Sequence, residues 1–268
     1  MESAFKYQFQ TLDYMSNAEE SKTRINDWVA SCTNGKIKDL FSELVSSTLC
    51  VLVSSIYFKG DWLYKFNPRY TSDAPFHCTE KKTSTGKMMI KERYFSYMNV
   101  NAKGFKCVKI SYNDRDLSML VILPNKRFGV EDVIKKLDAK TIENLKEGKQ
   151  FWNQLIILKM PKFRIEYEAI LYKTLRSLEI KDAFDRENAD FSAMSLQSKG
   201  LYVDEVVHKA FVEASEEGTE AAAATGIRTC KYSFSFDPKP LRFTVDHPFV
   251  FMILHKDQTL FMGKVTSL

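Results

Sequence analysis

The feature that most constrains the fold of this chain is an alanine-rich stretch at residues 213–236, EASEEGTEAAAATGIRTCKYSFSF. A helix packed on a core would carry large apolar side chains every three or four positions, and none lies between Val212 and Ile227. A disordered linker would be rich in proline and charge, yet residues 220–230 hold no proline and one interior charge, Arg228. We therefore predict a segment outside the core that is able to become a strand elsewhere.

With the period of a β-strand, one face of this stretch is uncharged, because Glu220 and Arg228 both fall on the other face. The side chains near the start of the stretch are all small, which leaves room to enter between two strands already in place. The alternative is an alanine-rich helical turn followed by an exposed loop, since alanine is the best helix former. The residues of the uncharged face are Thr219, Ala221, Ala223, Thr225, Ile227 and Thr229.

Composition limits the classes of function. The chain has 268 residues, 44% of them hydrophobic, which is enough for one large domain or two small ones with a sizeable core. The net charge of +5 is spread along the chain without a basic block, so no nucleic-acid partner is expected, while glycosaminoglycan binding is left open. No apolar run of membrane-spanning length occurs, so no membrane partner is expected. The first ten residues do not resemble a signal peptide, and the location is left open between cytoplasmic and extracellular.

Cysteine and histidine patterns argue against an enzyme. The five cysteines are far apart and have no metal-ligand spacing, so neither a metal nor another cofactor is expected, and free thiols are predicted. The chain has no Gly-x-Ser-x-Gly elbow, no His-Glu-x-x-His and no glycine-rich phosphate loop. A hydrolase that uses Cys230 is the weakest alternative, because no His or Asn partner can be assigned to it. His208 is interpreted as a core histidine and Trp62 as a packing anchor.

Hydrophobic periodicity predicts about ten strands and five or six helices. The helices are interspersed among the strands rather than alternating regularly, which is typical of an α+β fold with antiparallel or mixed sheets. Residues 48–58 form a nearly continuous apolar run and predict a strand buried on both faces. Other strands are expected at residues 5–11, 75–78, 87–90, 94–100, 105–111, 118–123, 154–159, 202–213, 241–245, 249–255 and 260–264, helices at 18–33, 130–137, 139–146 and 167–178, and a capped turn at 182–191.

Seven motifs in one order along the chain carry a resemblance to a known family. They are IYFKGDW at residues 56–62, MPKF at 160–163, DAFD at 182–185 followed by ADFS at 189–192, HKA at 208–210, EEGTEAAAAT at 216–225, DHPFVF at 246–251 and FMGKV at 261–265. Each motif alone is moderately specific, but together they span the chain. On these motifs the chain resembles the serpin family of serine protease inhibitors, as an intracellular-type or N-terminally truncated member.

The resemblance implies the serpin fold: a large mixed central β-sheet, further sheets, surface helices and an exposed reactive-centre loop at residues 216–240, within a single domain over residues 1–268. It also implies a suicide inhibitor. A protease cleaves the loop and becomes acyl-linked to it, and the loop then inserts as a new strand into the central sheet. The residues implied for the hinge of the loop are Glu216, Gly218, Thr219, Ala221 and Ala223, and those implied for the region where the sheet opens are Ser54, His208 and Trp62.

The family's spacing, counted as seventeen residues from Glu216, gives Tyr232–Ser233 as the reactive bond. Tyrosine before the cut favours a chymotrypsin-like serine protease, whose specificity pocket is apolar. A register one residue shorter, with the cut at Lys231–Tyr232, would favour a trypsin-like protease, and Arg228–Thr229 is a third possibility. The expected partner is thus a serine protease, bound by a monomer.

Two departures from the family pattern matter. Members usually have Asn-Ala before Ile-Tyr-Phe, where this chain has Ser54-Ser55, so the contact with His208 is expected to be held differently. The resemblance also begins near the first strand of the central sheet, and the family's N-terminal helices have no counterpart, so we expect an N-terminally truncated chain. This leaves a second hypothesis, a non-inhibitory serpin-derived binding or structural protein.

Overall fold

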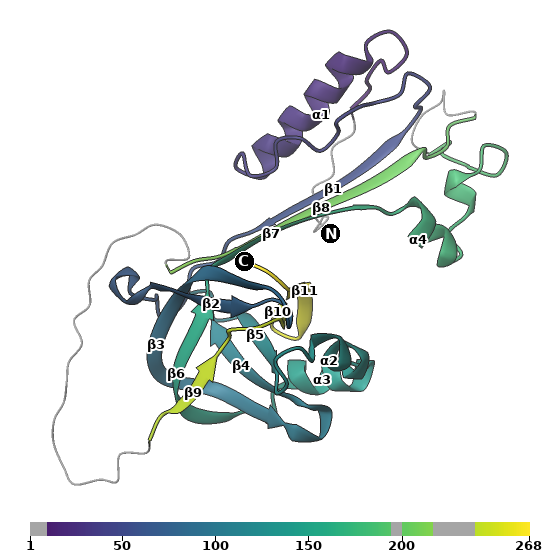
Figure 1. Ribbon diagram of the computed structural model, residues 1–268. Coiled ribbons are helices and arrows are strands. Elements are labelled where there is room, and N and C mark those ends of the chain that lie inside the picture. Colours follow the sequence, from purple (N-terminus) through teal and green to yellow (C-terminus); the bar gives the residue numbers. More distant parts are fainter. Residues whose placement is uncertain (1–9, 194–199, 217–238) are drawn as a thin grey trace. The chain divides into compact units, whose positions relative to one another are not determined.

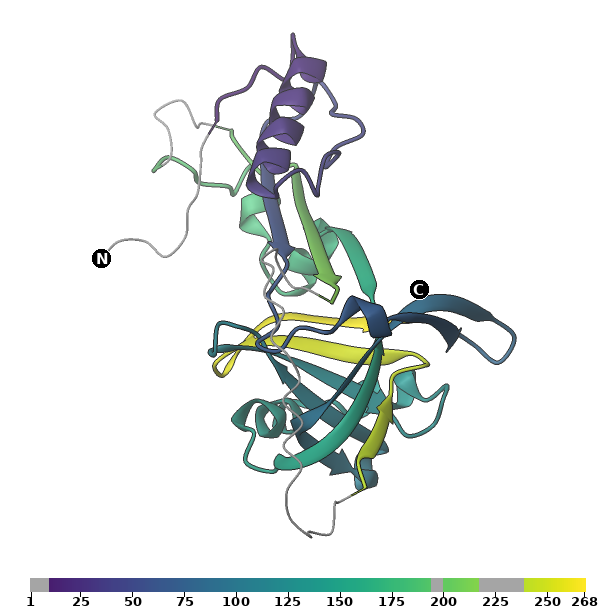
Figure 2. The same ribbon diagram turned by 90° about the vertical axis from the view of Figure 1, so that its left-hand side faces the viewer.

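The computed structural model describes residues 10–193, 200–216 and 239–268, and it divides the chain into two compact units (Figures 1 and 2). Unit 1 comprises Met1–Phe58 and Ile165–Val212, and unit 2 comprises Lys59–Arg164 and Glu213–Leu268. Both units combine strands with helices, so the α+β prediction is confirmed. Every helix in the described ranges is too short or too polar to cross a membrane.

Unit 1 is built on a three-stranded sheet with the order β1 (Val51–Phe58), β8 (Glu205–Ala214) and β7 (Phe163–Ile170). β1 and β8 are parallel neighbours, paired from Val51↔Glu205 to Phe58↔Val212. The two strands come from distant parts of the sequence. Each carries apolar, β-branched residues, which are suited to the pleated, half-buried surface of a sheet.

A helix and the loop after it cover one face of this sheet. The helix α1 (Ala18–Cys32) ends within one residue of the predicted boundary. Gly35, just after it, has a φ of 69° and donates its N–H to the carbonyl of Ala30 at 2.7 Å. Figures 1 and 2 show α1 alongside the β1–β8 pair. We call α1 together with residues 37–41 the cover. The buried side chains that join the cover to the sheet are Ile25, Val29, Ile37, Leu40, Phe41, Val207 and Phe211.

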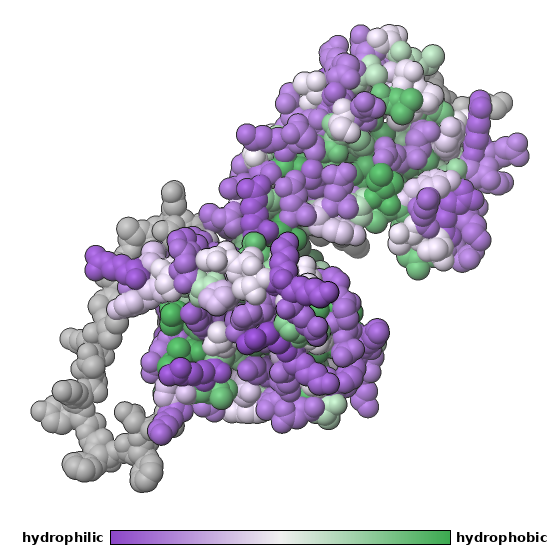
Figure 3. All heavy atoms as spheres, viewed as in Figure 1, coloured by the Kyte–Doolittle hydropathy of each residue, from purple (hydrophilic) through white to green (hydrophobic). Residues whose placement is uncertain are grey.

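The opposite face of β1 is not covered, which corrects the prediction that this strand is buried on both faces. Leu52 is 46% exposed and Ile56 is 40% exposed, while Val51, Val53 and Tyr57 on the other face pack against the cover. The apolar run alone could not reveal this difference, since a continuous run of apolar residues does not say which faces find a partner. In Figure 3 hydrophobic residues interrupt the hydrophilic surface of unit 1.

The helix predicted at residues 167–178 is also wrong in its first half. The chain forms β7 up to Ile170, and the helix α4 covers only Tyr172–Ser177. Residues 163–169 alternate Phe, Ile, Tyr and Ala with Arg and Glu, which is the period of a strand rather than of a helix. A 3-10 turn, η3 (Asp182–Phe184), follows within the predicted capped turn.

Unit 2 contains an eight-stranded sheet in the described residues, with the order β11-β10-β5-β4-β3-β6-β9 and with β2 paired to β3. The 18-residue strand β3 merges the strands predicted at residues 87–90 and 94–100 and pairs with β2, β4 and β6. The strands are β2 (Ser72–His77), β3 (Thr83–Val100), β4 (Phe105–Ser111), β5 (Leu117–Pro124), β6 (Trp152–Pro161), β9 (Leu241–Thr244), β10 (Phe249–His255) and β11 (Gln258–Val265).

Two helices, α2 (Val130–Lys136) and α3 (Ala139–Glu147), pack on this sheet (Figure 1). Asp138 caps α3 by accepting from the backbone N–H of Thr141 at 2.8 Å. The apolar faces of the helices join β3, β4, β5 and β10 in one core, in which a fully buried aliphatic or aromatic side chain contributes roughly 1.5–3 kcal/mol. Two short 3-10 turns, η1 (Pro68–Tyr70) and η2 (Asn101–Lys103), complete the unit. The strand predicted at residues 5–11 lies almost wholly outside the described residues.

Candidate functional site

Two residues of the predicted opening region meet across the parallel ladder of unit 1. Ser54 of β1 lies directly opposite His208 of β8 in the register. The imidazole Nδ1 of His208 lies 3.1 Å from the hydroxyl oxygen of Ser54, so a hydrogen bond joins the two side chains. We call Ser54 and His208 the closing pair, because a further strand could enter between β1 and β8 only if this contact broke.

The next residue of β8, Lys209, faces the opposite side of the sheet and is almost fully buried. Its ammonium group donates to the carbonyl oxygen of Asp39 in the cover at 2.9 Å. It also lies 3.2 Å from the carboxylate of Glu166 and 3.3 Å from that of Glu168, both on β7. Lys209 therefore joins β8, the middle strand of the sheet, to the cover. Its positive charge is balanced by the two carboxylates of β7.

In unit 2, Trp62 holds the chain just after β8. Its indole ring stacks on Tyr112 with the ring centroids 4.5 Å apart, and its Nε1–H donates to the carbonyl of Ser215 at 2.7 Å. The backbone N–H of Phe66 donates to the next carbonyl, that of Glu216, at 3.0 Å. Trp62 is buried, which agrees with its interpretation as a packing anchor. Two successive carbonyls at the start of the predicted loop are thus fixed.

Glu216, the first residue of the predicted hinge, is only 7% exposed. Its carboxylate lies 2.7 Å from the ammonium group of Lys162, which belongs to the MPKF motif. Burial works against the ionised carboxylate, but hydrogen bonds from Lys162 and from the residue's own backbone amide outweigh it and hold the pKa of Glu216 below its ordinary value. The start of the predicted loop therefore carries a charged anchor at neutral pH.

The other predicted site residues lie outside the described residues. In the described ranges, no cluster of three or more His, Cys, Asp and Glu side chains is arranged to hold a metal ion. In unit 1 the described residues offer two parallel strands held together by the closing pair. In unit 2 they offer the segment Ser215–Glu216, fixed by hydrogen bonds to its two carbonyls and by one ion pair. The predicted residues outside the described ranges are Gly218, Thr219, Ala221, Ala223, Lys231, Tyr232 and Ser233.

Comparison with known proteins decides the family. The family model described as Serpin (serine protease inhibitor) matches residues 1–268. The chain belongs to the serpin family. This serpin is 40% identical to leukocyte elastase inhibitor A of Mus musculus over 265 residues, which are 96% of this chain and 69% of that protein. It is 35% identical to human Serpin B11 over 270 residues, which are 99% of this chain and 68% of that protein.

Among solved structures, this serpin resembles uncleaved ovalbumin with a TM-score of 0.83 and 26% identity, over 96% of this chain and 65% of the ovalbumin chain. The serpin fold expected from the motifs is confirmed. The chain spans about two thirds of the length of the relatives that it matches. The names of these relatives give no support to the extracellular alternative left open by the sequence.

Sequence reasoning missed the contacts that fix the site. Lys162 and Glu216 form an ion pair although they lie 54 positions apart in the sequence, and no local pattern links them. The contact of Lys209 with Asp39 was missed for the same reason, although a lysine inside an apolar strand signals that a partner must exist. The closing pair was anticipated, because the resemblance assigned Ser54 and His208 to one region.

Proposed function

We propose that this serpin inhibits a serine protease as a suicide substrate. The loop at residues 216–240 is offered to the protease, is cleaved at Tyr232–Ser233, and then enters the sheet of unit 1 between β1 and β8. The observation that carries the proposal is the direct parallel pairing of β1 with β8, held by the closing pair. The alanine-rich stretch follows β8 closely in the sequence and has one uncharged face, whose side chains are small near its start.

The energy of insertion comes from exchanging one ladder for two. A strand that turns back after Glu216 runs antiparallel to β8, and also to β1, because β1 and β8 are parallel. The parallel ladder is lost, and two antiparallel ladders form in its place. Antiparallel pairing is slightly more stable per residue than parallel pairing, so the exchange gains backbone hydrogen bonds in number and in quality.

Insertion also requires contacts to break. It moves β1 and β8 apart by one strand spacing of about 4.8 Å, which the 3.1 Å hydrogen bond of the closing pair cannot survive. The cover contacts both strands, and Lys209 ties it to β8, so the cover must shift as well. These contacts keep the sheet closed until cleavage frees the loop.

The covalent step explains how the protease is retained. The protease's serine oxygen bonds to the carbonyl carbon of Tyr232, the bond to the nitrogen of Ser233 breaks, and that nitrogen leaves as an amine with the proton. Insertion then precedes hydrolysis of the ester. About fifteen inserted residues, at roughly 3.3 Å each, carry the linked protease about 50 Å.

The side chain before the cut indicates the class of target. Tyr232 fits a chymotrypsin-like protease with an apolar pocket, whereas a cut at Lys231–Tyr232 would fit a trypsin-like one. The name of the mouse relative, leukocyte elastase inhibitor A, says that it inhibits an elastase, which supports a serine protease as the target of this chain too. Glycosaminoglycan binding is not part of the proposal, and we expect a monomer.

The test is to incubate the chain with chymotrypsin and with trypsin. We expect a complex with chymotrypsin that survives SDS electrophoresis, and mass spectrometry should find the released fragment starting at Ser233. Tyr232→Gly should abolish the complex with chymotrypsin, while Lys231→Gly, next to it, should leave it intact. Cleavage of the loop without any stable complex would overturn the proposal.

The uncovered face of unit 1 favours a second function, that of a serpin-derived binding protein without inhibitory activity. Leu52 and Ile56 of β1 are exposed there. Tyr167 of β7 is also exposed, and it lies on the same face because its neighbours Glu166 and Glu168 contact Lys209 on the opposite, covered face. Exposed apolar patches mark interaction surfaces. A thermal melt before and after loop cleavage separates the two functions. Insertion raises the melting temperature sharply, and an unchanged melting temperature favours the binding protein.

A further inference from the structure

A small polar cavity lies in unit 2, where β3 and β4 stop pairing. The last described pair of this ladder is Ser96↔Lys109. Beyond this pair, the chain at the end of β4 contacts residues 62–63 instead of β3. The backbone N–H of Leu63 donates to the carbonyl of Ser111 at 3.0 Å, and Trp62 forms an antiparallel β-bridge with Tyr112. The two strands therefore fork, and a cavity of about 110 Å³ opens in the fork.

Two cations and no carboxylate line this cavity. Arg93 of β3 and Lys109 of β4 are among its lining residues, all of which are described, and none of these is acidic. The guanidinium carbon of Arg93 lies 3.0 Å from the ring centroid of Tyr64, which also lines the cavity. Stacking over a ring fixes the plane of a guanidinium group and leaves its in-plane N–H donors available.

A third cation, Lys91, lies two residues before Arg93 on the same strand. Burial, and next the charge of Arg93, lower the pKa of Lys91. Lys91 donates to the backbone carbonyl of Lys65 rather than to a carboxylate. This hydrogen bond therefore pairs Lys91 with a neutral acceptor and leaves its charge uncompensated by that contact.

Neutral donors complete the lining. Ser96 lies opposite Lys109 on one side and opposite Asn153 on the other, so the three form a row across β4, β3 and β6. Ser111 lines the cavity from the end of β4. In the described part of the chain, none of these four side chains makes a hydrogen bond to another protein group, so their hydroxyl, amide and ammonium donors remain available to a ligand.

We propose that this cavity binds a small tetrahedral oxyanion, either inorganic phosphate or sulfate or the same group carried on a sugar. A planar guanidinium fork, a lysine ammonium and hydroxyl donors are the groups that proteins use to hold such anions. The volume accommodates a few water-sized groups, which is the space that a five-atom oxyanion needs. The site is independent of loop insertion and of the proposed inhibition.

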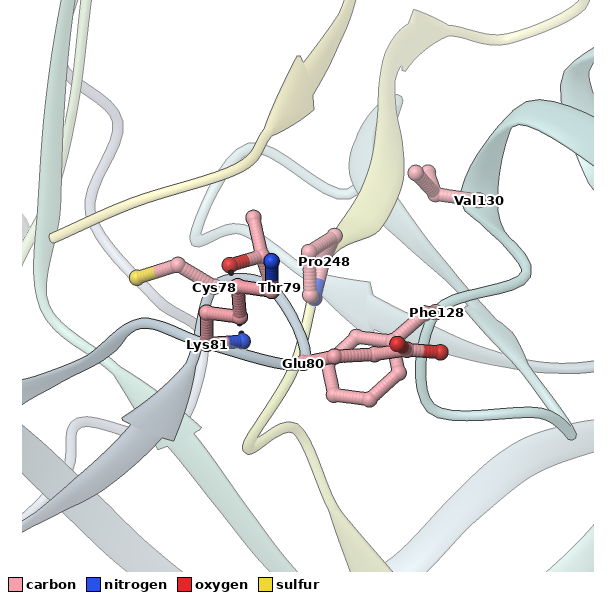
Figure 4. A pocket seen from close by; sticks show the side chains of 7 residues that line it. All are labelled: Cys78, Thr79, Glu80, Lys81, Phe128, Val130 and Pro248. Carbon is pink, nitrogen blue, oxygen red and sulfur yellow. Dashed lines mark hydrogen bonds between the residues drawn. The ribbon is translucent and has the colours of Figure 1, made fainter.

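The chain offers a matched control in a second cavity. A cleft of about 410 Å³ lies elsewhere in unit 2, and Figure 4 shows Glu80, Lys81, Phe128 and Pro248 among its lining side chains. The lining of this cleft includes a carboxylate, a lysine and an aromatic ring, whereas the cavity between β3 and β4 is lined by two cations and no carboxylate. Lys81→Gln removes one positive charge from unit 2 without touching the proposed site.

The experiment is isothermal titration of the full chain with sodium phosphate, with sodium sulfate and with sodium chloride at matched ionic strength. We expect saturable binding of phosphate and sulfate and none of chloride. Arg93→Gln and Lys109→Gln should each weaken phosphate binding about tenfold, which is the typical effect of losing one hydrogen bond to a charged group. Lys81→Gln should leave the affinity unchanged.

Further variants keep the result interpretable. Arg93→Lys retains the charge but loses the planar fork, so it should bind phosphate with intermediate affinity. Circular dichroism checks the fold of each variant, and Lys109→Gln decides the matter if Arg93→Gln does not fold. Glucose 6-sulfate, compared with glucose and with inorganic sulfate, distinguishes a sugar-borne group from a free anion. No saturable phosphate binding, or equal weakening by Lys81→Gln, would overturn the proposal.

Discussion

His208 and Ser54 are hydrogen-bonded across the β1–β8 ladder, although 154 positions separate them in the sequence. The contact joins the two strands at the position where the family pattern has asparagine in place of Ser54. A shorter side chain therefore makes the contact in this chain, and it does so at an ordinary hydrogen-bond length of 3.1 Å.

Ser54→Ala should lower the free energy of unfolding by about 0.5–1.5 kcal/mol, the net value of one hydrogen bond. Urea denaturation measures this change. Ser55→Ala is the matched control, because Ser55 is the next residue of β1 and faces the other side of the sheet. If Ser54→Ala and Ser55→Ala lower the free energy of unfolding equally, the contact with His208 does not stabilise the sheet.

Acid should release the anchor at Glu216. The pKa of its carboxyl is below the ordinary value of 4.5 in the folded protein, so the ion pair with Lys162 stabilises the fold above about pH 4.5. This stability is lost as the pH falls through the lower, folded-state pKa. The unfolding free energy of the wild type should therefore fall more steeply below pH 4.5 than that of Glu216→Gln.

Asp73→Asn gives the control for this pH effect. Asp73 and Lys87 form an ion pair of 2.9 Å, but both side chains are well exposed, and such pairs contribute little to stability. The pH profile of Asp73→Asn should run parallel to that of the wild type. Parallel profiles for Glu216→Gln as well would contradict the role of Glu216 as an anchor.

Trp62→Phe should lower the free energy of unfolding by about 1 kcal/mol or more, because it removes the hydrogen bond to Ser215 and leaves a space beside Tyr112. Chemical denaturation gives the stability, and limited proteolysis reports whether the chain after Glu216 is cut faster. Trp152→Phe, at a half-exposed tryptophan, should change the stability by less than about 0.5 kcal/mol. Equal losses in both variants would mean that Trp62 is an ordinary core residue.

The alternation of the alanine-rich stretch gives a test of insertion. Ala223→Arg puts a long charged side chain on the face that we expect to be buried, and it should turn the inhibitor into a substrate that chymotrypsin cleaves without forming a complex. Ala222→Arg puts the same side chain on the face that already carries Glu220 and Arg228, and it should still inhibit. Inhibition by both variants would show that this face is not buried.

The sequence predicted the elements best where apolar residues alternate between clear turn signals. Residues 105–111 and 249–255 were predicted at the bounds of β4 and β10, because turns or prolines mark their ends. The prediction failed at residues 167–170, where the strand period of β7 was read as the start of a helix. It failed again at β1, whose exposed face depends on what packs against it rather than on its own residues.

The candidate site was predictable only in part. The family motifs placed Ser54 and His208 together, but they could not give the ion pair of Glu216 with Lys162, because the pairing of distant charges depends on the fold. The proposed anion cavity left no trace in the sequence. Its residues come from separate segments, and they meet only because β3 and β4 diverge after Ser96↔Lys109.

The parallel ladder of unit 1 also sets an order of events during folding. Joining Ser54 to His208 closes a loop of 154 positions, and pairings between such distant segments form slowly. The alanine-rich stretch follows β8 closely in the sequence and needs a far shorter loop to reach the same edge. During folding, β1 and the alanine-rich stretch therefore compete to pair with the same edge of β8. The closed sheet forms only if the more distant segment, β1, pairs first.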